Sequence, residues 1–169
     1  TLTVNTDGTT AFNGAVGATR LGALTTDLNA GTDTNEKTTI GANISTGAVI
    51  TFNDPVSLVA TVTVSSSGTT VAFNSTLNGA QALTIANGAG AVTLSGAAGG
   101  TTPLTSLTTS GTGAVTISSG AVTTTGNQSY GGTITLGANT KLSGNTPTFA
   151  AAGVNGSGSN FNLTLDFSG

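Results

Sequence analysis

Short apolar segments separated by polar turns recur along the whole chain. In the clearest series two apolar residues flank a central residue, usually Thr, and the segments recur at a nearly constant spacing of roughly 20 residues. The series is Ile50-Thr51-Phe52, Val71-Ala72-Phe73, Val92-Thr93-Leu94, Val115-Thr116-Ile117 and Ile134-Thr135-Leu136. Because successive side chains of a strand point to opposite faces, the pattern predicts short strands with the apolar pair inside and the central residue outside.

A second series is interleaved with the first. It contains Val62-Thr63-Val64, Leu83-Thr84-Ile85 and a degenerate copy, Leu104-Thr105-Ser106. Turn signals such as Asn78-Gly79 and Asn87-Gly88 lie between the segments, and both residue types accept the positive φ that sharp corners require. The many β-branched residues, Gly and Asn, with no apolar period of 3.6 residues, exclude a helical fold.

Two architectures fit many short strands joined by regular turns: an antiparallel sandwich or barrel, and a parallel β-solenoid (β-helix). The period favours the solenoid, because stacked coils bring the same position of each coil into a ladder with a step of about 4.8 Å. We therefore expect an all-β fold, a parallel β-solenoid with coils of about 21 residues. The expected outward ladder is Thr51, Thr93, Thr116 and Thr135, and the expected inward ladder is Phe52, Phe73, Leu94, Ile117 and Leu136. The pattern weakens around residues 27–47, where we expect a bulged or looped coil.

A longer period is superimposed on the coils. The tripeptides Leu2-Thr3-Val4, Leu83-Thr84-Ile85 and Leu163-Thr164-Leu165 lie about 80 residues apart. This spacing predicts a first solenoid repeat at 1–82, a second at 83–162 and the start of a third at 163–169.

Composition narrows the function. Only 5% of the 169 residues are charged, the net charge is −3, and His, Cys, Met and Trp are absent. A mean hydropathy of +0.23 and the regular apolar positions argue against disorder. The scarcity of Lys and Arg argues against nucleic acid as a partner. No apolar run reaches the roughly 18–20 residues of a membrane helix, so we expect no membrane insertion. Without an initiator Met or a signal peptide, the chain is expected to be a fragment or a processed product.

We also expect the protein not to be an enzyme. Acid–base catalysis by a β-helix needs clustered acids and bases. Outside residues 27–36 the acids are Asp7, Asp54 and Asp166, which lie far apart in the sequence, and Asp54 precedes Pro55 in what reads as a turn.

One acidic segment resembles a metal loop. Carboxylate and amide side chains alternate there around Gly31, giving a calcium candidate of Asp27, Asn29, Asp33, Asn35 and Glu36. The order of an EF-hand is not met, and the Gly-Gly-x-Gly-x-Asp pattern of calcium-binding β-rolls is missing. A solvated loop extruded from the solenoid is the favoured interpretation, so no catalytic residue and no cofactor is expected, with calcium kept as the alternative.

Several segments look like those of a known group of proteins. TTTGNQSY at 123–130, ITLGANT at 134–140 and PLTSLTT at 103–109 resemble the repeats of giant bacterial surface exoproteins. These are the filamentous-haemagglutinin-like adhesins and the autotransporter passengers rich in β-strand repeats, and the resemblance covers essentially the whole chain. It implies a right-handed parallel β-helix, export across a Gram-negative envelope, an extracellular or cell-surface location, and a role as stalk or filament. It implies no catalytic residues.

The sequence thus predicts a structural, non-catalytic repeat segment of an exported surface adhesin or extracellular filament. Its expected partners are copies of itself stacked end to end, or flanking repeats of the same chain. The alternative is an adhesion module that binds a host receptor, a glycan or an ice surface through one solenoid face. Thr61-x-Thr63 and Thr133-x-Thr135 match the spacing of ice-binding arrays, but the residues that flank the outward Thr vary.

Overall fold

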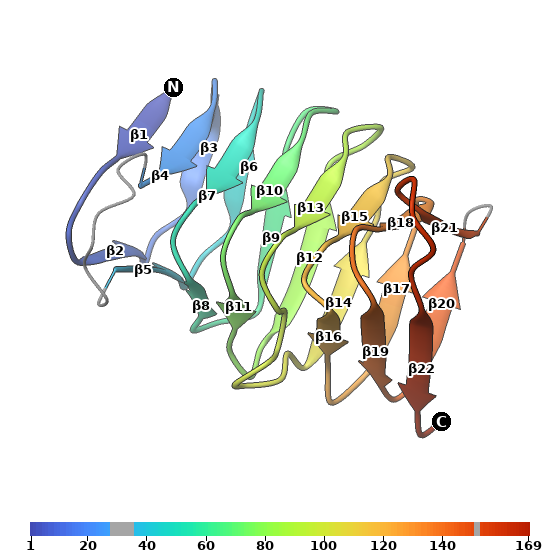
Figure 1. Cartoon of the computed structure of the whole chain (residues 1–169). Coiled ribbons are helices and arrows are strands. Elements are labelled where there is room, and N and C mark those ends of the chain that lie inside the picture. The colour runs from blue at the N-terminus through green and yellow to red at the C-terminus, as the bar shows by residue number, and fades with distance from the viewer. Residues whose placement is uncertain (28–35, 151–152) are drawn as a thin grey trace.

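The strands stack coil upon coil along one axis. The computed structural model describes residues 1–27, 36–150 and 153–169, and these residues contain strands and turns but no helix. Every strand pairs with its neighbours in parallel, one coil above or below. In Figure 1 the coils follow one another from the N-terminus at one end of the stack to the C-terminus at the other. The predicted parallel β-solenoid is therefore confirmed.

Three strand faces enclose the core. Face A is one continuous eight-stranded sheet. Its strands are β1 (Leu2–Val4), β4 (Leu24–Thr26), β7 (Ile50–Phe52), β10 (Val71–Phe73), β13 (Val92–Leu94), β15 (Val115–Ile117), β18 (Ile134–Leu136) and β21 (Val154–Gly156). Face C is a seven-stranded sheet. It contains β3 (Val16–Leu21), β6 (Ile44–Thr46), β9 (Val62–Ser65), β12 (Ala82–Ala86), β14 (Ser106–Thr109), β17 (Gln128–Tyr130) and β20 (Pro147–Phe149).

Face B is interrupted. Its first four strands are β2 (Thr9–Phe12), β5 (Lys37–Ile40), β8 (Val56–Leu58) and β11 (Leu77–Asn78). Its last three are β16 (Ala121–Thr123), β19 (Thr140–Gly144) and β22 (Leu163–Phe167). Single bridges from Leu77 to Ala98 and from Ala98 to Val122 join the two parts, so the face runs through one coil without a regular strand.

The predicted ladders of face A are confirmed residue by residue. Phe52, Phe73, Leu94, Ile117 and Leu136 pair in register and are buried. Thr51, Thr93, Thr116 and Thr135 are in register on the outer side, and Ala72 occupies the position between the first two. The rings of Phe52 and Phe73 stack with centroids 5.0 Å apart. Similar coils therefore place like side chains over one another, which is how a solenoid builds a core from short strands.

Some corners accept only Gly. Gly90, Gly113 and Gly132 each lie two residues before a face A strand and occupy the same corner of successive coils. A Cβ at Gly113 would overlap the carbonyl oxygen of Gly90, and a Cβ at Gly132 would overlap that of Gly113. The backbones of adjacent coils thus approach too closely for a side chain at Gly90, Gly113 or Gly132.

A polar network replaces apolar packing inside the later coils. Gln128 is fully buried, and its Nε2 donates to the carbonyl oxygens of Val122 and Ser143 and to Thr124 Oγ1. Its Oε1 accepts a 2.7 Å hydrogen bond from the buried Tyr130 hydroxyl. Burial raises the pKa of Tyr130, so this phenol stays protonated as a donor. Because both groups have partners, the network is tolerated within the core.

One predicted strand position is wrong. Leu104-Thr105-Ser106 was expected to stack on Leu83-Thr84-Ile85, but the partners of Leu83, Thr84 and Ile85 are Leu107, Thr108 and Thr109. Residues 95–105 form a longer connection between β13 and β14, which moves the strand three residues along the chain.

The three tripeptides of the longer period lie on three different faces. Leu2-Thr3-Val4 is β1 on face A, Leu83-Thr84-Ile85 lies in β12 on face C, and Leu163-Thr164-Leu165 lies in β22 on face B. The interval between the tripeptides is thus not a whole number of coils. The structural repeat is the coil, and the division at 82/83, which falls inside β12, stays a prediction from sequence similarity.

The expected irregular coil is present near the N-terminal end. Leu24 pairs with Ile50, and Ile50 pairs with Val71, so the coil that begins at Leu24 takes up more chain than the next one. The pairing of β3 with β6 also shifts register between Val16 and Leu21. The extra chain lies between the end of β4 and the start of β5, whereas only residues 53–55 join β7 to β8.

Candidate functional site

Two corners of adjacent coils bring three carboxylates together. Asp27 directly follows β4, and Glu36 directly precedes β5, so these two residues bound the long connection of their coil. Asp54 lies in the short corner between β7 and β8 of the next coil. Thr38 of β5 pairs with Val56 of β8. Glu36 precedes Thr38 by two residues, and Asp54 precedes Val56 by two residues. The parallel register therefore stacks Glu36 on Asp54.

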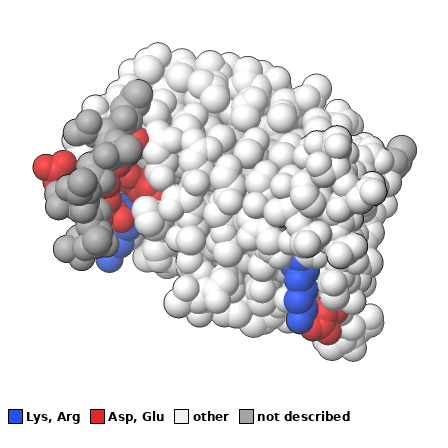
Figure 2. Space-filling view, in the orientation of Figure 1, with Lys and Arg blue, Asp and Glu red and all other residues white. Residues whose placement is uncertain are grey.

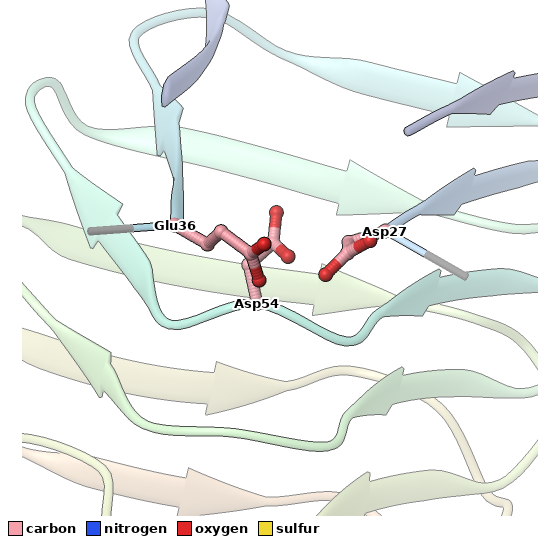
Figure 3. A group of neighbouring side chains, drawn as sticks. All are labelled: Asp27, Glu36 and Asp54. Carbon is pink, nitrogen blue, oxygen red and sulfur yellow. The ribbon is translucent and has the colours of Figure 1, made fainter. Parts of the chain in front are cut away.

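The carboxylates converge within a small volume. One carboxylate oxygen from each of Asp27, Glu36 and Asp54 lies within 4.8 Å of the others. Figure 3 shows the three side chains pointing toward one another, with Asp54 on the connection between two strands. Asp54 is 3% exposed and Asp27 is 7% exposed, whereas Glu36 is half-buried. Asp27 also adopts a φ of 39°, and its backbone N–H donates to the carbonyl oxygen of Val4.

Thr hydroxyls line the interior beside this cluster. On face B the inward column reads Thr10, Thr38, Val56 and Leu77, so it changes from polar to apolar along the axis. Thr26 of β4 likewise pairs with Phe52, one coil further on. Thr38 Oγ1 donates a 2.8 Å hydrogen bond to Asp54 Oδ2. The corner occupied by the acids is thus more polar inside than the apolar coils that follow it.

Burial and the neighbouring charge act together on Asp54. Desolvation raises the pKa of Asp54 most strongly, and the carboxylate of Asp27 raises it further, while the hydrogen bond from Thr38 opposes both. Asp54 Oδ1 is buried and has no hydrogen-bond partner among the described residues. Two ionised carboxylates cannot hydrogen-bond to each other, so a proton or a cation is needed to relieve the repulsion.

The structure modifies the predicted calcium candidate. It places Asp27 and Glu36 close together, whereas Asn29, Asp33 and Asn35 lie outside the described residues. The prediction of a solvated loop is wrong for Asp27, which is buried against the solenoid. Sequence reasoning missed Asp54, assigning it only to a turn. The available signal was its place about one coil after Asp27, since residues one coil apart stack.

The outer faces carry columns of hydroxyl side chains. On face A the column runs Thr93, Thr116 and Thr135, and on face C it runs Thr63, Thr84 and Thr108. Charges are sparse between the two ends of the rod, as Figure 2 shows for one side of the molecule. Near the C-terminal end, exposed Lys141 and Asp166 form an ion pair at 2.6 Å.

Comparison with protein-family models, with curated proteins and with solved structures finds no match to this chain. The resemblance to filamentous-haemagglutinin-like repeats thus stays a prediction from the three segments at 103–109, 123–130 and 134–140. Among the described residues there is no helix of the length and apolar character needed to cross a membrane.

Proposed function

We propose that this chain is a structural, non-catalytic segment of an exported bacterial surface adhesin or extracellular filament, and that it acts as a stiff rod. The observation that supports the proposal most strongly is the continuous stacking of coils along one axis. Eight successive strands of face A stack in register, with buried residues beneath nearly the whole length. At about 4.8 Å per step, eight strands span roughly 34 Å between first and last.

Stiffness follows from how adjacent coils are joined. Each coil is hydrogen-bonded to the next on more than one face, and the apolar side chains of neighbouring coils contact each other inside. Corner side chains add ladders of their own, because Asn74 Nδ2 donates to Asn53 Oδ1 at 2.7 Å and Asn53 Nδ2 donates to the carbonyl oxygen of Thr26. Bending such a rod separates coils and breaks several of these contacts at once.

The two ends of the rod suit further stacking. β1, β2 and β3 are the edge strands at one end, and β20, β21 and β22 are those at the other. The apolar residues there, including Leu2, Val16, Phe149 and Val154, are only partly buried, and Leu165 of β22 is 50% exposed. Unpaired edges over apolar side chains are templates for another coil. We propose that flanking coils of a longer chain, or a second copy, cover them.

A matched pair of variants tests the stacking. Leu165→Lys places a charge on an end strand, whereas Val59→Lys replaces a similarly exposed apolar side chain, 55% exposed, that follows β8 in the middle of the stack. We expect the first change to reduce end-to-end association, measured by sedimentation velocity and electron microscopy, and the second to leave it unchanged. Equal effects of the two variants would show that association does not proceed through the rod end.

Antibody labelling tests the cellular role. Antibodies raised against the purified chain are applied to intact and to permeabilised cells of the source organism. We expect labelling of intact cells, along filaments or a surface layer. Labelling confined to permeabilised cells would contradict export and the whole proposal.

The hydroxyl columns favour one second candidate, an adhesion module. The three successive Thr residues of face A, Thr93, Thr116 and Thr135, offer the same donors and acceptors at regular intervals, which suits a glycan, a host receptor or ice. Binding of the chain to glycan arrays or host cells, or thermal hysteresis of its solutions, would support this function. In that case Thr116→Lys on face A is expected to abolish binding, with Val59→Lys, which lies outside both hydroxyl columns, as the control.

A further inference from the structure

We propose that Asp27, Glu36 and Asp54 form a binding site for one divalent cation, with Ca²⁺ as the preferred ion. The site joins two adjacent coils at the corner where faces A and B meet. It differs from the loop candidate suggested by the sequence, because one of its three ligands comes from the next coil. The proposal holds whether or not the rod is a surface filament.

The first support is the geometry of the oxygens. Ca²⁺ binds oxygen ligands at about 2.3–2.6 Å, so two oxygens on one ion lie at most about 5 Å apart. The three carboxylate oxygens lie within 4.8 Å of one another, which satisfies this limit. Asp27 and Glu36 can each bind through both oxygens and Asp54 through Oδ1, which gives up to about five ligands, and water can complete the roughly six to eight that Ca²⁺ takes.

The second support is independent of the clustering. Asp54 is only 3% exposed, and its Oδ1 has no hydrogen-bond partner among the described residues. Figure 3 shows its carboxylate turned toward those of Asp27 and Glu36. Buried polar atoms in proteins nearly always have a partner, and a buried carboxylate oxygen without one carries a desolvation cost. A cation placed between the three acids would bind this oxygen and neutralise the group.

The surroundings distinguish Asp54 from an ordinary turn residue. Asp54 lies two residues after Phe52, and the equivalent positions after Phe73 and Leu94 are Ser75 and Gly96. In these three coils the acid therefore occurs only in the one that lies against Asp27 and Glu36. Thr38 holds one oxygen of Asp54 at 2.8 Å, which fixes the carboxylate while leaving the other oxygen for a ligand.

The ligand set selects the class of ion. All three side chains offer hard carboxylate oxygens, and the chain has no Cys or His for softer metals. Mg²⁺ demands near-ideal octahedral geometry and keeps most of its water, whereas Ca²⁺ accepts irregular, partly bidentate coordination. Three acids from two connections in adjacent coils match the second description.

Calorimetry with metal-free protein tests the site. The full chain is stripped with a chelator, and its Tm is measured without divalent cation, in millimolar Ca²⁺ and in millimolar Mg²⁺ at one ionic strength. With a dissociation constant of about 0.1–1 mM, Ca²⁺ at about 1 mM is expected to raise Tm by roughly 1–6 °C. Isothermal titration is expected to give one Ca²⁺ per chain, with Mg²⁺ producing a clearly smaller shift.

Three variants locate the ion. Asp54→Asn keeps an oxygen to accept the Thr38 hydroxyl, so it should fold, and it is expected to lose most of the Ca²⁺-dependent shift in Tm. Glu36→Gln should do the same, whereas Asp7→Asn, which removes an exposed acid, should keep the full shift. The proposal is overturned if wild-type Tm does not respond to Ca²⁺, if Asp54→Asn responds as wild type does, or if Mg²⁺ is as effective as Ca²⁺.

Discussion

The stacked phenylalanines offer the sharpest quantitative prediction. Phe73 is 1% exposed at the centre of the inward ladder of face A, between Phe52, with which its ring stacks at 5.0 Å, and Leu94. Phe73→Ala and Phe73→Leu remove different parts of this arrangement. Phe73→Ala opens a cavity inside three coils, while Phe73→Leu supplies the side chain that the same ladder already uses at Leu94 and Leu136.

The two losses can be estimated separately. Truncation of a buried Phe to Ala costs about 3–5 kcal/mol in unfolding free energy, from lost burial plus the cavity. Phe73→Leu keeps most of the volume, so its cost is mainly the ring stack with Phe52, about 0.5–1.5 kcal/mol. Ala72→Thr changes the outward position of the same strand, where both register neighbours are Thr, and should lie within about 0.5 kcal/mol of wild type.

Equilibrium urea unfolding measures all three changes. Far-UV circular dichroism follows the strands of the whole rod, and fluorescence of the single Tyr, Tyr130, follows the buried network of a distant coil. We expect the order Phe73→Ala, Phe73→Leu, Ala72→Thr from most to least destabilised. Equal costs for Phe73→Ala and Phe73→Leu, or a larger cost for Ala72→Thr than for Phe73→Leu, would refute the assignment of the inward ladder as the source of stability.

Three other changes have definite expected outcomes. Gly113→Ala should destabilise the chain by about 1–3 kcal/mol in urea unfolding, because the added Cβ would overlap the neighbouring coil. A Cβ at Gly14 meets nothing within 4 Å, so Gly14→Ala should be nearly neutral. Similar results for both variants would contradict the close approach of the coils. Tyr130→Phe leaves the buried Oε1 of Gln128 without its donor and should cost about 1–3 kcal/mol, so an unchanged midpoint would show that the network is not maintained. Because the folded-state pKa of Asp54 lies above its ordinary value of 3.8, the folded chain binds that proton more tightly than the unfolded chain. Without divalent cation this contribution to stability is present below about pH 4 and is lost as pH rises through the raised pKa. Asp54→Asn should therefore flatten that part of a plot of Tm against pH. Parallel curves for the variant and the wild type would contradict this role of Asp54.

The sequence predicted the coil and its cross-section well because the relevant signal is local. Alternation within three residues decides which side chains point inward, and the recurrence of the same triplet decides which residues stack. For this reason the ladders through Phe52 and Thr51 were predicted residue by residue. The expected disturbance near residues 27–47 was also visible, since the apolar triplets stop there.

The arrangement of corners was less predictable, because it depends on the length that each connection takes up. The connection 95–105 is long enough that Leu107, and not Leu104, pairs with Leu83. The apolar pattern of the sequence does not reveal this change of three residues. The longer-period similarity was misleading for the same reason: it relates strands of similar sequence that lie on different faces.

The acidic cluster depended on contacts that only stacking creates. Asp27 and Asp54 are separated in the sequence by a complete coil, so neither looks special beside its own neighbours. The register between β5 and β8 brings Glu36 to Asp54, and the register between β4 and β7 brings the chain after β7 back beside Asp27. Gln128 and Tyr130 likewise form their hydrogen bond inside the core, and the sequence alone does not show that these polar residues are buried.

Fibre diffraction combined with electron microscopy of the purified chain tests whether the coils form a rigid rod. We expect stiff particles or fibres with a reflection near about 4.8 Å along the long axis, because the strands run across the rod and the coils stack along it. Long fibres would identify end-to-end stacking, and short straight rods would identify a stalk segment. Flexible strings, or rounded particles without that axial spacing, would contradict the claim that this chain is a rigid structural rod.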